Sequence, residues 1–175
     1  VIMLSPLAFV LVLSFGINKL SVGASQAIFW AFAAVMGLSL SSIFLVYTGA
    51  SIAKVFFITA ASFGALSLWG YTTKHDLSPI GTFLIMGVIG IIVASLLNMF
   101  FFKSTMMHMI ISVLGLLIFA GLTAFDTQRL KNMYFQLAGN SRAMAVATTY
   151  GALSLYLDFV NMFQFMLAIM SGNRN

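Results

Sequence analysis

The chain has 175 residues, of which 62% are hydrophobic and only 6% are charged, with a net charge of +5. Soluble domains are about one-quarter charged, so this composition would leave large apolar patches in water and instead indicates a membrane protein. The basic residues are scattered along the chain rather than clustered, which argues against a nucleic-acid partner. We therefore expect the lipid bilayer to be its main partner.

Six apolar runs are candidates for membrane-spanning helices, each of which needs about 20 mostly apolar residues. In chain order they are 1–15, 27–47, 53–71, 80–102, 109–125 and 143–170. The runs lack the apolar–polar alternation of barrel strands, and no long linker separates them. We predict an all-α integral membrane protein with one transmembrane domain, 1–175, built as a bundle of six helices.

The first run, "VIMLSPLAFVLVLSF", begins in apolar sequence without the methionine and basic segment that open a signal peptide. We therefore expect the chain to lack its natural N-terminus.

Basic residues in the connectors predict the orientation, because cytoplasmic loops carry an excess of Lys and Arg. With six spans, one side collects five basic residues and the other collects three. The five are Lys19, Lys74, Arg129, Lys131 and Arg142. This bias favours a cytoplasmic location for their side and places the C-terminus outside.

Two of the three acidic residues lie within or beside apolar runs, although a charged Asp at a helix centre costs about 2.5–3.5 kcal/mol. Asp158 lies inside the last run, and Asp126 closes the fifth unless that helix continues through the amphipathic segment after it. Acids in such positions commonly mark an ion or proton pathway. The third acid, Asp76, precedes Pro79, as expected near the start of a helix.

Polar side chains near the two membrane acids follow helical spacing. The stripe on the last run consists of Tyr150, Ser154, Asp158 and Asn161. The stripe on the fifth run consists of Thr123, Asp126 and Thr127. Because polar stripes turn away from lipid, we expect these two to face each other or water.

The apolar parts of these two runs contain no Lys, Arg or His, so Asp126 is the most available partner for Asp158. Two carboxyl groups in a low dielectric cannot both ionise cheaply, and one shared proton gives a strong hydrogen bond. A pair that changes its bonding when a second proton binds is a candidate pH switch. Alternatively, each Asp bonds a nearby backbone group and the two never meet.

The sequence offers no pattern typical of catalysis or of a tightly held metal. It contains no Cys, no Gly-rich phosphate loop, no Ser nucleophile with an evident His partner and no His–Asp cluster with metal-ligand spacing. We expect neither an enzyme nor a resident cofactor.

The segments "AGLTAFDTQRLK" and "GALSLYLDFVNMF", with "GYTTKHDL" ahead of them, resemble the motifs of the Bax inhibitor-1 family in its bacterial YccA branch. The resemblance covers nearly the whole chain and implies seven transmembrane helices with the last one central, one helix more than the six found here. It implies a pH-sensitive calcium leak channel of the bacterial inner membrane that acidification opens. The sensor would be the aspartate pair Asp126 and Asp158, which would also bind the conducted Ca²⁺ weakly. No basic residue in 1–15 matches the cation on an early helix that latches one aspartate in some members.

Two other functions stay open. Bacterial relatives are linked to a membrane-bound ATP-dependent protease, which implies a non-conducting regulator that docks its partner through the amphipathic stretch 128–142. The same carboxyl groups would also suit a proton-coupled transporter.

Overall fold

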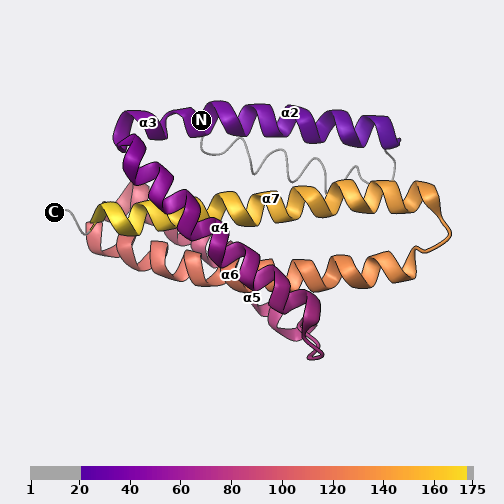
Figure 1. Cartoon of the computed structure of the whole chain (residues 1–175). Helices are drawn as coiled ribbons and strands as arrows, with labels where there is room; N and C mark the ends of the chain where they lie inside the picture. The colour runs from indigo at the N-terminus through magenta and orange to yellow at the C-terminus, as the bar shows by residue number, and fades with distance from the viewer. Residues whose placement is uncertain (1–20, 173–175) are drawn as a thin grey trace.

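The computed structural model describes residues 21–172 and folds them into helices joined by short turns (Figure 1). In chain order the elements are α2 (Val22–Ser41), α3 (Ile43–Val46), α4 (Gly49–Thr72), α5 (Ser78–Leu97), the π-helix η2 (Asn98–Phe102), α6 (Thr105–Gln136) and α7 (Ser141–Gly172). The described range contains no strand, so the predicted all-α class is confirmed.

Five helical stretches in the described range are long and apolar enough to cross a membrane. They are Val22–Val46, Gly49–Thr72, Ser78–Phe102, Thr105–Gln136 and Ser141–Ser171. Each contains most or all of one predicted run, from the second run to the sixth. The first predicted run, 1–15, lies outside the described residues, so the predicted count of six is not matched as a whole.

The fifth predicted run ends too early, because α6 continues past Phe125 to Gln136. Hydropathy falls after Phe125, but the helix still buries one face: the side chain of Leu130 packs directly on Gly151 of α7. With 32 residues each, α6 and α7 are about 48 Å long, whereas the hydrocarbon core of a bilayer is about 30 Å thick. Because α6 runs to Gln136, the alternative prediction that the fifth helix continues through the amphipathic segment after Asp126 is confirmed.

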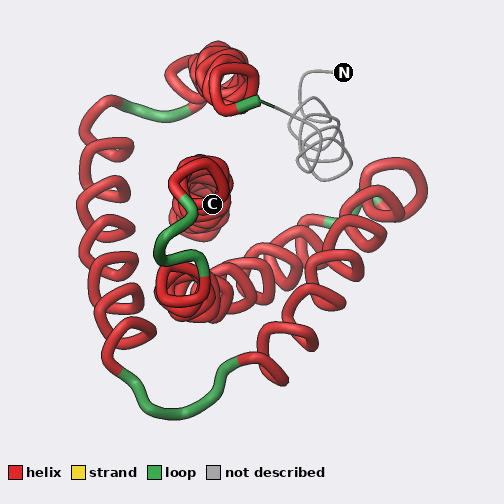
Figure 2. The backbone as a smooth tube through the Cα atoms, turned by 90° about the vertical axis from the view of Figure 1, so that its right-hand side faces the viewer, coloured by secondary structure: helices red, strands yellow, loops and turns green. Residues whose placement is uncertain are grey.

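The last helix, α7, lies in the middle of the described helices, with α2, α4 and α6 around it (Figure 2). Side chains from the outer helices fill the space around α7: Phe32 and Met36 of α2 pack against Val160, and Val55 of α4 packs against Leu167. α6 contacts α4, α5 and α7, so it links the centre of the bundle to its outer side.

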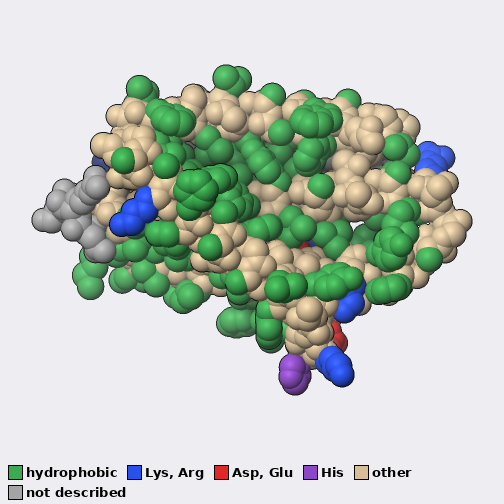
Figure 3. Space-filling view, viewed as in Figure 1, with side chains coloured by type: hydrophobic (Ala, Val, Ile, Leu, Met, Phe, Trp, Pro, Cys, Tyr) green, Lys and Arg blue, Asp and Glu red, His purple; other side chains and the backbone are tan. Residues whose placement is uncertain are grey.

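Large apolar side chains cover the outside of the bundle, whereas Lys and Arg side chains lie at its ends and near the α4–α5 connector (Figure 3). Leu45, Phe83 and Phe101 are 88%, 73% and 76% exposed. This distribution fits a molecule whose sides face lipid and whose ends face water.

Two adjacent residues of α6, Ala124 and Phe125, contact two different helices, α4 and α5. A glycine on each of those helices allows it to approach α6 closely. A Cβ atom built on Gly70 of α4 would lie 2.8 Å from both the carbonyl carbon and the Cα of Ala124. A Cβ atom built on Gly81 of α5 would lie 2.6 Å from Cγ of Phe125. The backbones of α4 and α6 therefore touch immediately before Asp126.

Replacing Gly70 with alanine is expected to lower the free energy of unfolding by about 1–3 kcal/mol, because the new methyl group collides with backbone that cannot rotate away. Gly64→Ala in the same helix is the matched control, since a Cβ there has no neighbour within 4 Å. Thermal unfolding in detergent measures both variants. Equal stability of the two would contradict the backbone contact.

Candidate functional site

Contacts between α6 and α7 on either side of Asp126 show which part of α7 this acid faces. On one side of Asp126, Thr123 Oγ1 lies 3.4 Å from Met162 Sδ. On the other side, the Arg129 guanidinium lies 5.4 Å from the centre of the Tyr150 ring. Between these contacts, the carboxyl groups of Asp158 and Asp126 lie near enough to interact electrostatically. The structure thus brings the two predicted acids together.

Both carboxyl groups are buried, with Asp126 6% exposed and Asp158 4% exposed. Within the described part of the chain, Oδ2 of Asp158 has no hydrogen-bond partner. An unpaired buried carboxylate oxygen is unfavourable, so this atom is a natural acceptor for a proton or a cation.

Arg129 supplies a cation beside the pair, although the apolar parts of the two predicted runs contain no basic residue. Its Nη2 donates to Oδ1 of Asp126 at 2.9 Å. Its guanidinium also lies 5.5 Å from the centre of the Phe125 ring and 5.4 Å from the centre of the Tyr150 ring. The sequence assigned Arg129 to a connector, whereas it lies on α6 one turn after Asp126. The spacing of three residues on a continued helix is the signal that identifies the ion pair.

Hydroxyl and amide groups near the pair bond to the backbone of their own helices. Thr123 Oγ1 donates to the carbonyl of Phe119, Thr127 Oγ1 to that of Thr123, and Asn161 Nδ2 to that of Leu157, each at 2.8 Å. Their oxygen lone pairs remain free to accept a bond or to approach a cation. These neutral oxygens would make weak ligands for Ca²⁺, which prefers six to eight oxygens that include carboxylates.

The other members of the predicted polar stripe have different roles. Tyr150 stacks against Arg129, and Ser154 is half-buried on α7. In the described range, no group of three or more His, Cys, Asp or Glu side chains is placed to hold a metal ion. The site therefore consists of two carboxyl groups and one guanidinium, with weaker polar groups nearby.

Gln128 fastens α6 to the α4–α5 connector, a role that the sequence analysis did not identify. Its Nε2 donates to the carbonyl of His75 at 2.7 Å, and its Oε1 accepts from the backbone N–H of Leu77 at 2.9 Å. Because these partners are more than 50 residues away along the chain, helical spacing gives no signal for the contact. The first residue of the possible docking stretch 128–142 is therefore buried and already bonded, whereas most of the later residues are exposed.

The fold and the site define a helical membrane protein that buries two aspartates on its last two helices, beside a partly exposed arginine. A family model described as "Inhibitor of apoptosis-promoting Bax1" matches residues 1–175. The chain belongs to this family, the Bax inhibitor-1 family, as its motifs predict.

Several bacterial proteins are similar over almost the whole chain. The inner membrane protein YbhL of Escherichia coli K12 is 49% identical over 177 residues, which cover 99% of this chain and 74% of YbhL. A protein of Caulobacter vibrioides is 49% identical over 174 residues, or 99% of this chain and 69% of that protein. The protein RP147 of Rickettsia prowazekii is 41% identical over 175 residues, or 100% of this chain and 73% of RP147.

Proposed function

We propose that this protein is a pH-sensitive Ca²⁺ leak channel of a bacterial inner membrane, with Asp126 and Asp158 as its proton sensor. The observation that carries the proposal is the burial of these two carboxyl groups together beside Arg129. The similarity to YbhL, named as an inner membrane protein, supports the location.

The charge of the site changes sign with the number of bound protons. Two carboxylates and one guanidinium carry −1 without a bound proton, zero with one proton and +1 with two. Net charge in a low dielectric is unfavourable, so each step favours a different arrangement of α6 and α7. We expect a shift between these helices to open the pathway on acidification.

The site offers the conducted ion few strong ligands. Weak binding of this kind suits a passive leak pathway rather than a site that retains Ca²⁺. Ca²⁺ would meet the two carboxylates and the neutral oxygens of Thr123, Thr127 and Asn161. Weak binding allows an ion to leave as readily as it enters.

Ca²⁺ entry into liposomes that contain the protein is expected to be faster at pH 6 than at pH 8, and to stop when the gradient is gone. The initial rate is measured with an enclosed Ca²⁺ indicator at pH 6, 7 and 8, with protein-free liposomes as the control. Rates equal to that control at every pH would contradict the proposal and favour a non-conducting regulator. Ca²⁺ accumulation against its gradient, driven by a pH difference, would instead indicate a proton-coupled transporter.

A further inference from the structure

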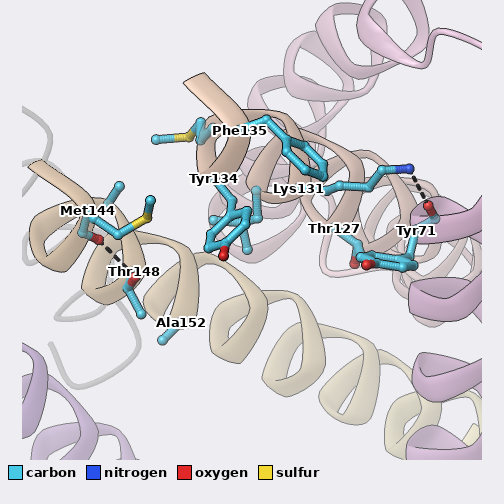
Figure 4. A pocket seen from close by; sticks show the side chains of 11 residues that line it. Tyr71, Thr127, Lys131, Tyr134, Phe135, Met144, Thr148 and Ala152 are labelled. Carbon is cyan, nitrogen blue, oxygen red and sulfur yellow. Dashed lines mark hydrogen bonds between the residues drawn. The ribbon is translucent and has the colours of Figure 1, made fainter. Parts of the chain in front are cut away.

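Two hollows of similar size meet at Lys131, near the end of α6. One is apolar, has a volume of about 500 Å³, and lies between the end of α6 and the start of α7 (Figure 4). The other is polar, has a volume of about 530 Å³, and lies beside the α4–α5 connector. Because Lys131 lines both, they form one amphipathic site with a polar half and an apolar half.

The polar half carries a net positive charge, because Lys74 and Lys131 face a single acid, Asp76. Oδ1 of Asp76 accepts the backbone N–H of Ser78 at 3.0 Å, and hydrogen bonds from that serine lower the pKa of Asp76. Lys131 Nζ donates one hydrogen bond to the carbonyl of Tyr71 at 2.7 Å, which leaves two N–H groups for an anion.

The apolar half has walls from two helices. Met144, Thr148 and Ala152 of α7, spaced by four residues, line one wall (Figure 4). Thr148 Oγ1 is already bonded to the carbonyl of Met144 at 2.8 Å, so its hydroxyl hydrogen is occupied. Tyr134 and Phe135 of α6 line the hollow and are 61% and 66% exposed. A hydrocarbon chain matches such walls.

We propose that this site binds one anionic phospholipid of the cytoplasmic leaflet, with the phosphate in the polar half and an acyl chain in the apolar half. Basic pockets between transmembrane helices on the cytoplasmic side suit anionic headgroups, and charge bias assigns this end of the bundle to that side. A free phosphate ion would occupy only the polar half, whereas Lys131 connects a charged group to an adjoining hydrocarbon groove.

Native mass spectrometry of lipid retained by the full chain tests the proposal. The protein is reconstituted in equal amounts of phosphatidylglycerol and phosphatidylcholine and then transferred to a mild detergent. Wild type is expected to retain phosphatidylglycerol about fivefold or more over phosphatidylcholine. The double variant Lys74→Gln/Lys131→Gln should lose this preference, and Asp76→Asn should increase it. Lys54→Gln, at the exposed opposite end of α4, is the matched charge control and should retain it.

Ala152→Trp tests the apolar half, because it fills the groove without changing charge. It should reduce the retained amount of both lipids at least about fivefold, while thermal unfolding shows that the variant remains folded. Unchanged phosphatidylglycerol preference in the double lysine variant, or unchanged lipid retention by Ala152→Trp, would overturn the proposal. A copurifying polypeptide bound in place of lipid would also overturn it.

Discussion

Replacing either Asp126 or Asp158 with asparagine is expected to leave Ca²⁺ flux nearly independent of pH, with less than about a twofold change between pH 6 and 8. Each variant removes one of the two carboxyl groups, so the remaining one has no second acid with which to share a proton. A wild-type switch linked to one proton can change its population about tenfold per pH unit, or about 100-fold over two units. Initial rates of Ca²⁺ entry into liposomes measure this difference.

The two variants should differ in their flux at fixed pH, although both lose the pH response. Asp158→Asn leaves the Asp126–Arg129 bond as it stands, whereas Asp126→Asn leaves Arg129 to pair with Asp158 across the helices. Asp76→Asn is the matched control, because this acid lies outside the spanning helices and should leave the pH response unchanged. A wild-type pH response in both Asp126→Asn and Asp158→Asn would refute the sensor role.

Replacing Arg129 with glutamine is expected to lower the free energy of unfolding by about 1.5–3 kcal/mol, because it leaves the buried Asp126 without a charged hydrogen-bond partner. The contacts of the guanidinium with Phe125 and Tyr150 are weakened as well. For a chain of this size, the loss corresponds to a fall of roughly 3–12 °C in the unfolding midpoint in detergent.

Arg142→Gln is the matched control, because Arg142 is exposed in the first turn of α7, where a positive charge opposes the helix dipole. Its removal should be neutral or slightly stabilising. The double variant Arg129→Gln/Asp126→Asn should recover part of the lost stability, since it removes both charges of the pair. An equal loss in Arg142→Gln, or strict additivity in the double variant, would show that the ion pair does not stabilise the protein.

Hydropathy predicted where the chain meets lipid, but not where a helix continues into water. The runs 27–47 and 80–102 end within one residue of the observed spans, because apolar composition and the start of a polar connector coincide there. α6 differs, since its last turns are amphipathic and are held by neighbouring elements rather than by lipid. The resemblance to a known family was the strongest sequence signal, and the family match confirms it.

The helical spacing of polar residues predicted the polar faces of α6 and α7. It did not predict every side chain or backbone group that the residues on these faces contact. It grouped Thr123 with Asp126, and it left open whether Asp126 and Asp158 meet. Arg129 was missed because a residue counted as part of a connector was not considered as a partner on the same helix. Gln128 could not have been identified, because its partners follow only from the docking of the α4–α5 connector.

The backbone contact between Gly70 and Ala124 also determines which helices can slide past one another. No side chain separates α4 from α6 at this point, so no rotamer change can absorb a relative displacement there. α2, in contrast, touches α7 through the side chains of Phe32 and Met36, which permit small shear movements. In the proposed rearrangement around the aspartates, we therefore expect α4 and α6 to stay together as one frame while the central helix α7 moves relative to them.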